Sequence, residues 1–467
     1  MHMGKYKRLA GDTLLFAIGN LGSKLILFLL VPLYTNYLTK AEYGTAELIY
    51  TASNLIMPVT SMVIFDAVLR FMLDKNIDRK SVILNAGIVF IGGSLVALLL
   101  APLVGLYPSL SEWKWFVSAY IITYMANQIT MTYIKAKEKT KLYVVLGLSQ
   151  TLLLALLNIF LLVFCRLKVY GYVLANIFAQ TTIIIAGLVI GGILKDLKTA
   201  RFDKKLFFEM LAFSSPLIIN NISWWVVQSS DKLMVEIFLD SAALGIYTAA
   251  SKIPALINVV SSIFSQSWGI SSVKEYDSTK DTSFYSNVFS LFSFAVFFFC
   301  ACLLVIIKPF MGVYVGADFY EAWKYVPWLL IAASFSAISS YFGAIYGALK
   351  KSVNVMLSTL LSASINIIFN FLLIPRFGIM GATAATAVAY IFIGLYRMFD
   401  TRRFFKFDIN FRKEFASYLV VCISAFFVTA DQFGYAVAGA AVLIVWLLNL
   451  KEMKKLLSAV LKFVRLR

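Results

Sequence analysis

The segment LTKAEYG at residues 38–44 has a counterpart, LDSAALG, at residues 239–245. Each segment follows one long apolar stretch and leads directly into the next, which is typical of a short link between two helices. A weaker match at a similar offset pairs Arg166–Gly171 with Arg376–Gly381. Both offsets correspond to about six helices and indicate an internal duplication. Because six is an even number, the two copies should have the same orientation across a membrane.

The apolar stretches around these links are too numerous for a soluble protein. Of the 467 residues, 61% are hydrophobic and 14% are charged, against roughly a quarter charged in soluble domains. A soluble multidomain enzyme is therefore excluded. At about 20 residues per crossing, the apolar material supplies about 14 helices of an all-α membrane protein. The expected spans are 11–37, 43–69, 80–106, 113–136, 142–165, 169–194, 207–238, 242–269, 284–307, 322–348, 352–374, 377–398, 413–430 and 433–449.

The duplication divides the chain into three parts. Residues 1–200 form an N-terminal lobe of helices 1–6, and residues 201–400 form a C-terminal lobe of helices 7–12. Residues 401–467 add a helix pair, 13 and 14, and a basic tail. Two similar lobes predict a cavity between them and a rocking motion, which is the architecture of a transporter.

The formal net charge of +18 is distributed over alternate links. Counted from a cytoplasmic N-terminus, 32 of the 42 basic residues fall on the inner segments, 7 on the outer segments and 3 within helices. Cytoplasmic loops of membrane proteins are rich in Lys and Arg. We therefore expect an even number of spans with both termini in the cytoplasm, and no nucleic-acid partner.

Lys24 is the most informative charge within a predicted span. It lies near the middle of the first helix, farther from either end than a lysine can snorkel. Facing lipid, it would cost at least about 2.5–3.5 kcal/mol. Lys24 therefore faces either a carboxylate on a neighbouring helix or a wet cavity in which it holds an anion. Lys252 lies similarly far from the end of the eighth helix. We therefore expect the two lysines, one from each lobe, to bind the same anionic ligand.

Further polar residues are candidates for substrate binding. In the seventh helix, Asn221, Gln228 and Lys232 follow helical spacing and share one face. Asp231 lies beside them, and Asn20 lies in the first helix. For Asp231 and Lys232 the alternative is an anchor at the outer membrane surface.

The candidates for a coupling ion, either a proton or Na⁺, are two acids of the second helix. Asp66 lies close to Arg70, where a simple salt bridge is the plainer interpretation, and Glu47 lies near the outer end. The four cysteines form no CxxC pair, and the only histidine is His2. We therefore expect no metal site, no catalytic residue and no resident cofactor.

The motifs around the seventh and eighth helices resemble those of a known family. The run from Ser230-Asp231-Lys232 through Leu244-Gly245-Ile246-Tyr247 to Lys252 resembles the corresponding region of the Wzx-type polysaccharide flippases. Residues 38–44 resemble the N-terminal Leu-x-x-x-x-Tyr-Gly segment of the same family. The superfamily also contains the multidrug and toxin extrusion (MATE) transporters and the lipid II flippases.

This resemblance implies a MATE-like, fourteen-helix transporter that carries an undecaprenyl-diphosphate-linked oligosaccharide to the outer leaflet by alternating access. Membrane lipid and other polysaccharide-assembly proteins would be its partners. Lys24 and Lys252 match positions where relatives place cations of the cavity. Leu25, and not an acid, follows Lys24, which favours a surface polysaccharide (O-antigen, capsule or teichoic type) over lipid II. The last helix pair resembles a hairpin that shelters the lipid tail in relatives.

Two other functions stay open. An ion-coupled drug or organic-cation exporter of the same fold would need dominant carboxylates within the membrane. A membrane glycosyltransferase or polymerase would need acids on a sizeable outer loop, and the longest outer loop, about residues 308–321, holds only Asp318 and Glu321.

Overall fold

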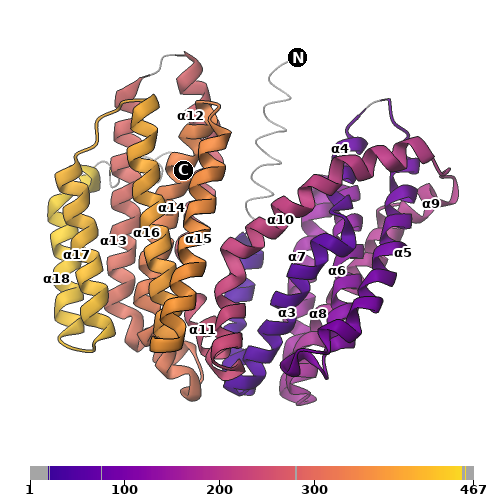
Figure 1. Ribbon diagram of the computed structural model, residues 1–467, viewed down its shortest axis with the longest axis horizontal. Coiled ribbons are helices and arrows are strands. Elements are labelled where there is room, and N and C mark those ends of the chain that lie inside the picture. The colour runs from indigo at the N-terminus through magenta and orange to yellow at the C-terminus, as the bar shows by residue number, and fades with distance from the viewer. Residues whose placement is uncertain (1–18, 20, 75, 279–280, 455–457, 459–467) are drawn as a thin grey trace. The chain divides into compact units, whose positions relative to one another are not determined.

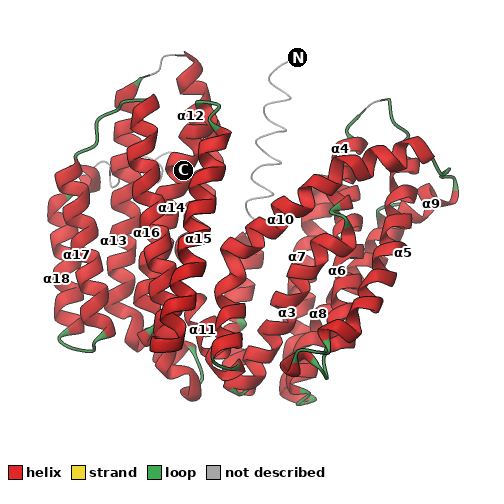
Figure 2. Cartoon of the chain, viewed as in Figure 1, coloured by secondary structure: helices red, strands yellow, loops and turns green. Residues whose placement is uncertain are grey.

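The computed structural model describes the chain except for residues 1–18, 20, 75, 279–280, 455–457 and 459–467. All regular structure among the described residues is helical (Figure 2). Eight helices are long and apolar enough to cross a membrane, and two bent helix pairs also qualify if each is one span. The predicted all-α membrane fold is confirmed, and its physical basis is that a helix satisfies its own backbone hydrogen bonds within a bilayer.

The helices gather into two compact units. The first comprises Met1–Glu236 and Asp240–Gly245, and the second comprises Ile237–Leu239 and Ile246–Arg467. The predicted division at residues 200 and 400 stays a prediction.

Within the first unit, α6 packs against α5 on one side and α8 on the other, and α7 packs against α8 (Figure 1). A turn of π-helix, Ile159–Phe164, follows α7. The helices of this unit are Leu21–Tyr37 with α2 (Val31–Tyr37) as its second half, α3 (Lys40–Ser61), α4 (Ile64–Met72), α5 (Arg79–Val104), α6 (Lys114–Ala136), α7 (Thr140–Asn158), α8 (Lys168–Ile190), α9 (Ile193–Lys198) and most of α10 (Lys204–Phe238).

Within the second unit, α14 packs against α12 and α16, and α17 and α18 form a hairpin against α13. Trp268 of α12 stacks on Tyr341 of α14 at 4.7 Å between ring centroids and donates its indole N–H to the Tyr341 carbonyl oxygen. The helices after α11 (Ser241–Ser251), which begins in the first unit, are α12 (Pro254–Ser278), α13 (Thr282–Tyr314), α14 (Val326–Ala348), α15 (Ser352–Phe377), α16 (Ile379–Phe404), α17 (Phe411–Thr429) and α18 (Gly434–Leu448), with a 3-10 helix at Ala317–Lys324.

Each predicted span coincides, in its described part, with one helix or with consecutive helices, and two spans expected to be continuous are bent by more than 40°. Between α3 and α4 the axis bends by 54°, because Met62 and Val63 adopt left-handed backbone angles with φ of 50° and 51°. Between α11 and α12 it bends by 46° just before Pro254, whose ring removes an N–H donor and crowds the preceding turn.

The links alternate between the two ends of the first unit. At one end, Lys168 at the start of α8 pairs with Glu42 at the start of α3, with 2.9 Å between Nζ and Oε1. At the other end, Arg79, Lys137 and Asp196 line one pocket, although they belong to three separate links. Alternate links thus lie at the same end of the first unit, and which end is cytoplasmic stays a prediction.

Candidate functional site

The interior of the first unit contains an ion pair between two helices. Lys232 of α10 donates to the carboxylate of Glu47 of α3, and Glu47 is only 3% exposed. Close by, the indole N–H of Trp225 donates to the carbonyl oxygen of Thr51 at 3.1 Å, which fixes α10 along α3. A buried charge requires such a partner, because an unpaired one would cost several kcal/mol.

Four tyrosines of the first unit interact electrostatically with Glu47 of this ion pair. Tyr34 lies 4.9 Å from Tyr172 between ring centroids, and Tyr50 lies 5.8 Å from Tyr120. The charge of Glu47 acts on the hydroxyl groups of all four rings. Tyr50 is 41% exposed, so part of this aromatic surface is open.

Lys24 and Lys252, the two predicted anion-binding lysines, belong to different units. Lys24 is exposed on the apolar helix Leu21–Tyr37, and no carboxylate of the described residues lies within ion-pair distance of it. Lys252 is half-buried and lies at the bend between α11 and α12, not inside a continuous helix as expected. Their sharing of one chamber stays a prediction.

The residues predicted to form one polar face of α10 differ in their exposure and in their partners. Gln228 is exposed, whereas the side-chain amide of Asn221 donates to the Leu217 carbonyl oxygen of its own helix at 3.0 Å. Asp231 is 8% exposed, and Lys232 pairs with Glu47. For Asp231 and Lys232 the alternative of an anchor at the membrane surface stays a prediction. Asn20 lies outside the described residues.

The two candidate coupling acids differ in their surroundings. Glu47 is buried against Lys232, whereas Asp66 of α4 is half-buried and interacts electrostatically with Lys135. Among the described residues, Asp66 and Arg70 do not form the expected salt bridge, and the side chain of Arg70 is exposed. Neither acid is assigned a coupling role by this geometry.

Arg397 of α16 is a buried charge that sequence reasoning missed. It is 7% exposed and donates to the Ser358 and Thr359 hydroxyl groups at 2.9 and 2.8 Å and to the Ser339 carbonyl oxygen at 3.2 Å. The sequence offered no signal for this burial, because Arg397 stands among the basic residues of a predicted inner link. It joins α14, α15 and α16 from within the second unit.

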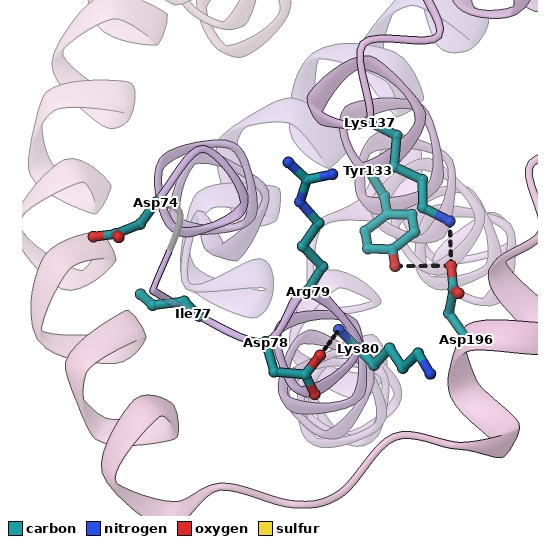
Figure 3. Close-up of a pocket in the computed structure, with 8 residues that line it drawn as sticks. All are labelled: Asp74, Ile77, Asp78, Arg79, Lys80, Tyr133, Lys137 and Asp196. Atoms are coloured by element: carbon teal, nitrogen blue, oxygen red, sulfur yellow. Dashed lines mark hydrogen bonds and ion pairs between the residues drawn. The ribbon is translucent and has the colours of Figure 1, made fainter.

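A separate pocket of about 460 Å³ lies at the end of the first unit where the predicted inner links meet (Figure 3). Lys137 and the Tyr133 hydroxyl group both donate to Asp196, the latter at 3.0 Å. Burial raises the pKa of Asp196, but these donors outweigh it and hold the pKa below its usual value. The other lining residues are Asp74, Ile77, Asp78, Arg79 and Lys80.

The helices that are long and apolar enough to cross a membrane define a multi-pass membrane protein. The profile of a family described as "Polysaccharide biosynthesis protein" matches residues 9–269, which is more than half of the chain. The chain belongs to this family, and the resemblance to the polysaccharide flippases is confirmed.

Relatives and solved structures are similar to this chain in sequence and in fold, respectively. A "probable low-salt glycan biosynthesis flippase" of Haloferax volcanii is 28% identical over 190 residues, which cover 39% of this chain and 39% of the relative's length. The lipid II flippase MurJ in an inward closed conformation superimposes with a TM-score of 0.70 at 16% identity, over 96% of this chain and all of that one. An inward-facing multidrug MATE transporter gives 0.61 at 11% identity, over 81% and 98%. The MATE-like fold is thereby confirmed.

Proposed function

We propose that the protein translocates an undecaprenyl-diphosphate-linked oligosaccharide from the cytoplasmic to the outer leaflet of a bacterial cytoplasmic membrane. The family match and the flippase relative from Haloferax volcanii support a lipid-linked glycan as cargo. Three basic links lie at one end of the first unit, and this supports a cytoplasmic position for that end.

The environment of Lys24 is the observation that carries this proposal. An ammonium group on an apolar helix needs either a carboxylate or water and an anion. Lys24 is exposed, and the described residues offer it no carboxylate within ion-pair distance. This favours an ammonium that meets a mobile anion over one that holds two helices together.

The diphosphate-sugar head group is the part of the cargo that cannot cross the membrane unaided. Each unpaired polar group costs several kcal/mol in about 30 Å of hydrocarbon. In the proposed cycle, Lys24 and Lys252 replace the lost hydration of the diphosphate while the access of the cavity alternates. A membrane potential that is positive outside favours outward movement of an anion by about 2.3 kcal/mol per charge and 100 mV.

In this proposal, aromatic and amide side chains contact the sugar units, and an acidic side chain couples transport to a proton. The exposed rings of Tyr50 and Trp224, at 41% and 50%, offer flat apolar faces to the sugar units. Glu47 is the candidate for a coupling proton, because protonation would remove the charge that holds Lys232. Gln228 is exposed on the same helix as Trp224 and offers an amide to sugar hydroxyl groups.

The decisive experiment measures movement of lipid-linked oligosaccharide in proteoliposomes that contain the full chain. We expect Lys24→Ala and Lys252→Ala each to lower the rate by at least about tenfold, and Lys24→Arg to retain part of it. Lys141→Ala, an exposed cation of an inner link, is the matched control. Full activity of both single variants and the double variant would remove the site assignment. Transport of organic cations without transport of glycolipid would replace the proposed function by that of a drug exporter.

A further inference from the structure

The pocket of Figure 3 is built from three links of the first unit. The link between α4 and α5 contributes Asp74 and Arg79, the end of α6 contributes Lys137, and α9 contributes Asp196. Figure 3 shows Arg79 and Lys80 extending from the start of α5 toward the side where Tyr133, Lys137 and Asp196 lie. A volume of about 460 Å³ falls in the range of small-ligand sites.

The carboxylates of this pocket are already occupied by donors of the protein. Asp78 caps α5 by accepting from the backbone N–H groups of Lys80 and Ser81, both at 3.2 Å, and from the Ser81 hydroxyl group at 2.9 Å. Asp196 accepts from Lys137 and from Tyr133. Asp74 accepts from the backbone N–H of Asn76 at 3.0 Å.

The two remaining charged side chains of the pocket are both cations. In the described part of the chain, no carboxylate oxygen lies within 4.0 Å of the side-chain nitrogens of Arg79 or Lys80. At longer range, the positive charge of Lys80 attracts the carboxylates of Asp78 and Asp196 electrostatically. Lys137 stands on the opposite wall with Asp196 as its partner. The six charged side chains of the lining carry no net formal charge, but the two cations without a carboxylate partner within 4.0 Å complement an anion with several acceptor oxygens.

We propose that this pocket binds the phosphate group of an anionic phospholipid. A guanidinium group holds two phosphate oxygens at once, and the ammonium group of Lys80 adds a point charge beside it. The pocket lies at the ends of α4, α5 and α6, where spans of a membrane protein meet the head-group layer. Basic pockets between membrane helices on the cytoplasmic side are a known kind of lipid head-group site. Ile77 in the lining and the 57% exposed Leu73 supply apolar surface for the lipid's glycerol and chain ends.

The test measures lipid binding directly and does not depend on transport. Native mass spectrometry of the purified full chain would compare phosphatidylglycerol, phosphatidylcholine and the soluble probe glycerol 1-phosphate. We expect phosphatidylglycerol to bind the unaltered chain most tightly, and Arg79→Gln with Lys80→Gln to weaken it by about tenfold or more. The control pair, Lys141→Gln with Lys198→Gln, removes the same charge from exposed positions outside the pocket and should leave binding within about twofold.

Three outcomes would overturn the proposal. Equal weakening by the two variant pairs would show attraction to the basic surface as a whole. Equal affinity for phosphatidylglycerol and phosphatidylcholine would show that the pocket ignores the head group's net charge. Tight binding of glycerol 1-phosphate that is lost in the pocket variant would identify a soluble phosphate as the ligand. An unchanged thermal midpoint of the lipid-free pocket variant would confirm that it is folded.

Discussion

Gly44 of α3 and Gly245 of α11, which are 201 positions apart, pack reciprocally against each other's first helical turn. A Cβ atom on Gly44 would lie 1.7 Å from the Ser241 carbonyl oxygen, and one on Gly245 would lie 2.1 Å from that of Lys40. The two glycines end the repeated segments from which the duplication was inferred. The repeat therefore marks a place where the same position in each copy must lack a side chain.

Replacement of Gly44 by alanine should force the first turns of α3 and α11 apart. We expect Gly44→Ala to destabilise the protein by about 1–3 kcal/mol, the usual cost of overpacking, and to lower the thermal midpoint in detergent. Gly87→Ala on α5 is the matched control, because no heavy atom lies within 4 Å of its added Cβ. Equal midpoints for the two variants would contradict the close approach.

The buried pair of Glu47 and Lys232 should show strong energetic coupling. Removal of either charge leaves the other buried, so Glu47→Gln and Lys232→Met should each cost about 3 kcal/mol. The double variant should recover at least about 1 kcal/mol relative to the sum, as a double-mutant cycle would measure. The exposed pair of Lys205 and Glu209, 3.9 Å apart, is the control and should couple by less than about 1 kcal/mol. Additive losses at Glu47 and Lys232 would refute the pairing.

The proposed coupling role of Glu47 predicts a specific defect in transport. In proteoliposomes held at constant membrane potential, Glu47→Gln should abolish any acceleration by a proton gradient, because an amide cannot take up the proton. Glu112→Gln, an exposed acid of the first unit, should leave that acceleration intact. A response in Glu47→Gln equal to that of the unaltered chain would remove Glu47 as the coupling acid.

Arg397 should be irreplaceable by lysine within the second unit. An ammonium group cannot form all the hydrogen bonds that the guanidinium group donates to Ser358, Thr359 and Ser339. Arg397→Lys should therefore lower the free energy of unfolding by about 2–4 kcal/mol. Arg403→Ala is the control, since this side chain is 79% exposed and its 3.5 Å pair with Asp400 should contribute about 1 kcal/mol or less. The thermal midpoints of both variants would check this, and a stable Arg397→Lys protein would contradict it.

Asp196 should make stability depend on pH at the acidic end. Its lowered pKa in the folded protein means that its contribution is fully present above the unfolded value of about 3.9 and is lost as the pH falls through the lower folded value. The thermal midpoint of Asp196→Asn should therefore lie below that of the unaltered chain at pH 7 and 5, and the gap should close below about pH 4. Asp408→Asn, at an exposed loop position, should show no such gap. A constant gap at all pH values would exclude the ionisation of Asp196 as its cause.

Some features could be predicted from the sequence because the bilayer imposes them segment by segment. Each span must be apolar and must satisfy its own backbone hydrogen bonds, so hydropathy and length located all of the predicted helices in their described parts. The alternation of basic links is equally local, and the links containing Arg79, Lys137 and Asp196 meet in one pocket as that alternation requires.

The tertiary structure alone decided which charges meet and which helices break. Helical spacing assigns Lys232 to a face of α10 but cannot identify a partner 185 residues away, and that partner is Glu47. Arg397 is buried because acceptors from α14 and α15 converge on it, although its own neighbours in sequence resemble an exposed basic link. The left-handed angles at Met62 and Val63 are likewise imposed by packing, since neither residue favours them by itself. Contacts between distant segments depend on the three-dimensional arrangement of all the helices, whereas the helices themselves depend on local sequence and the membrane.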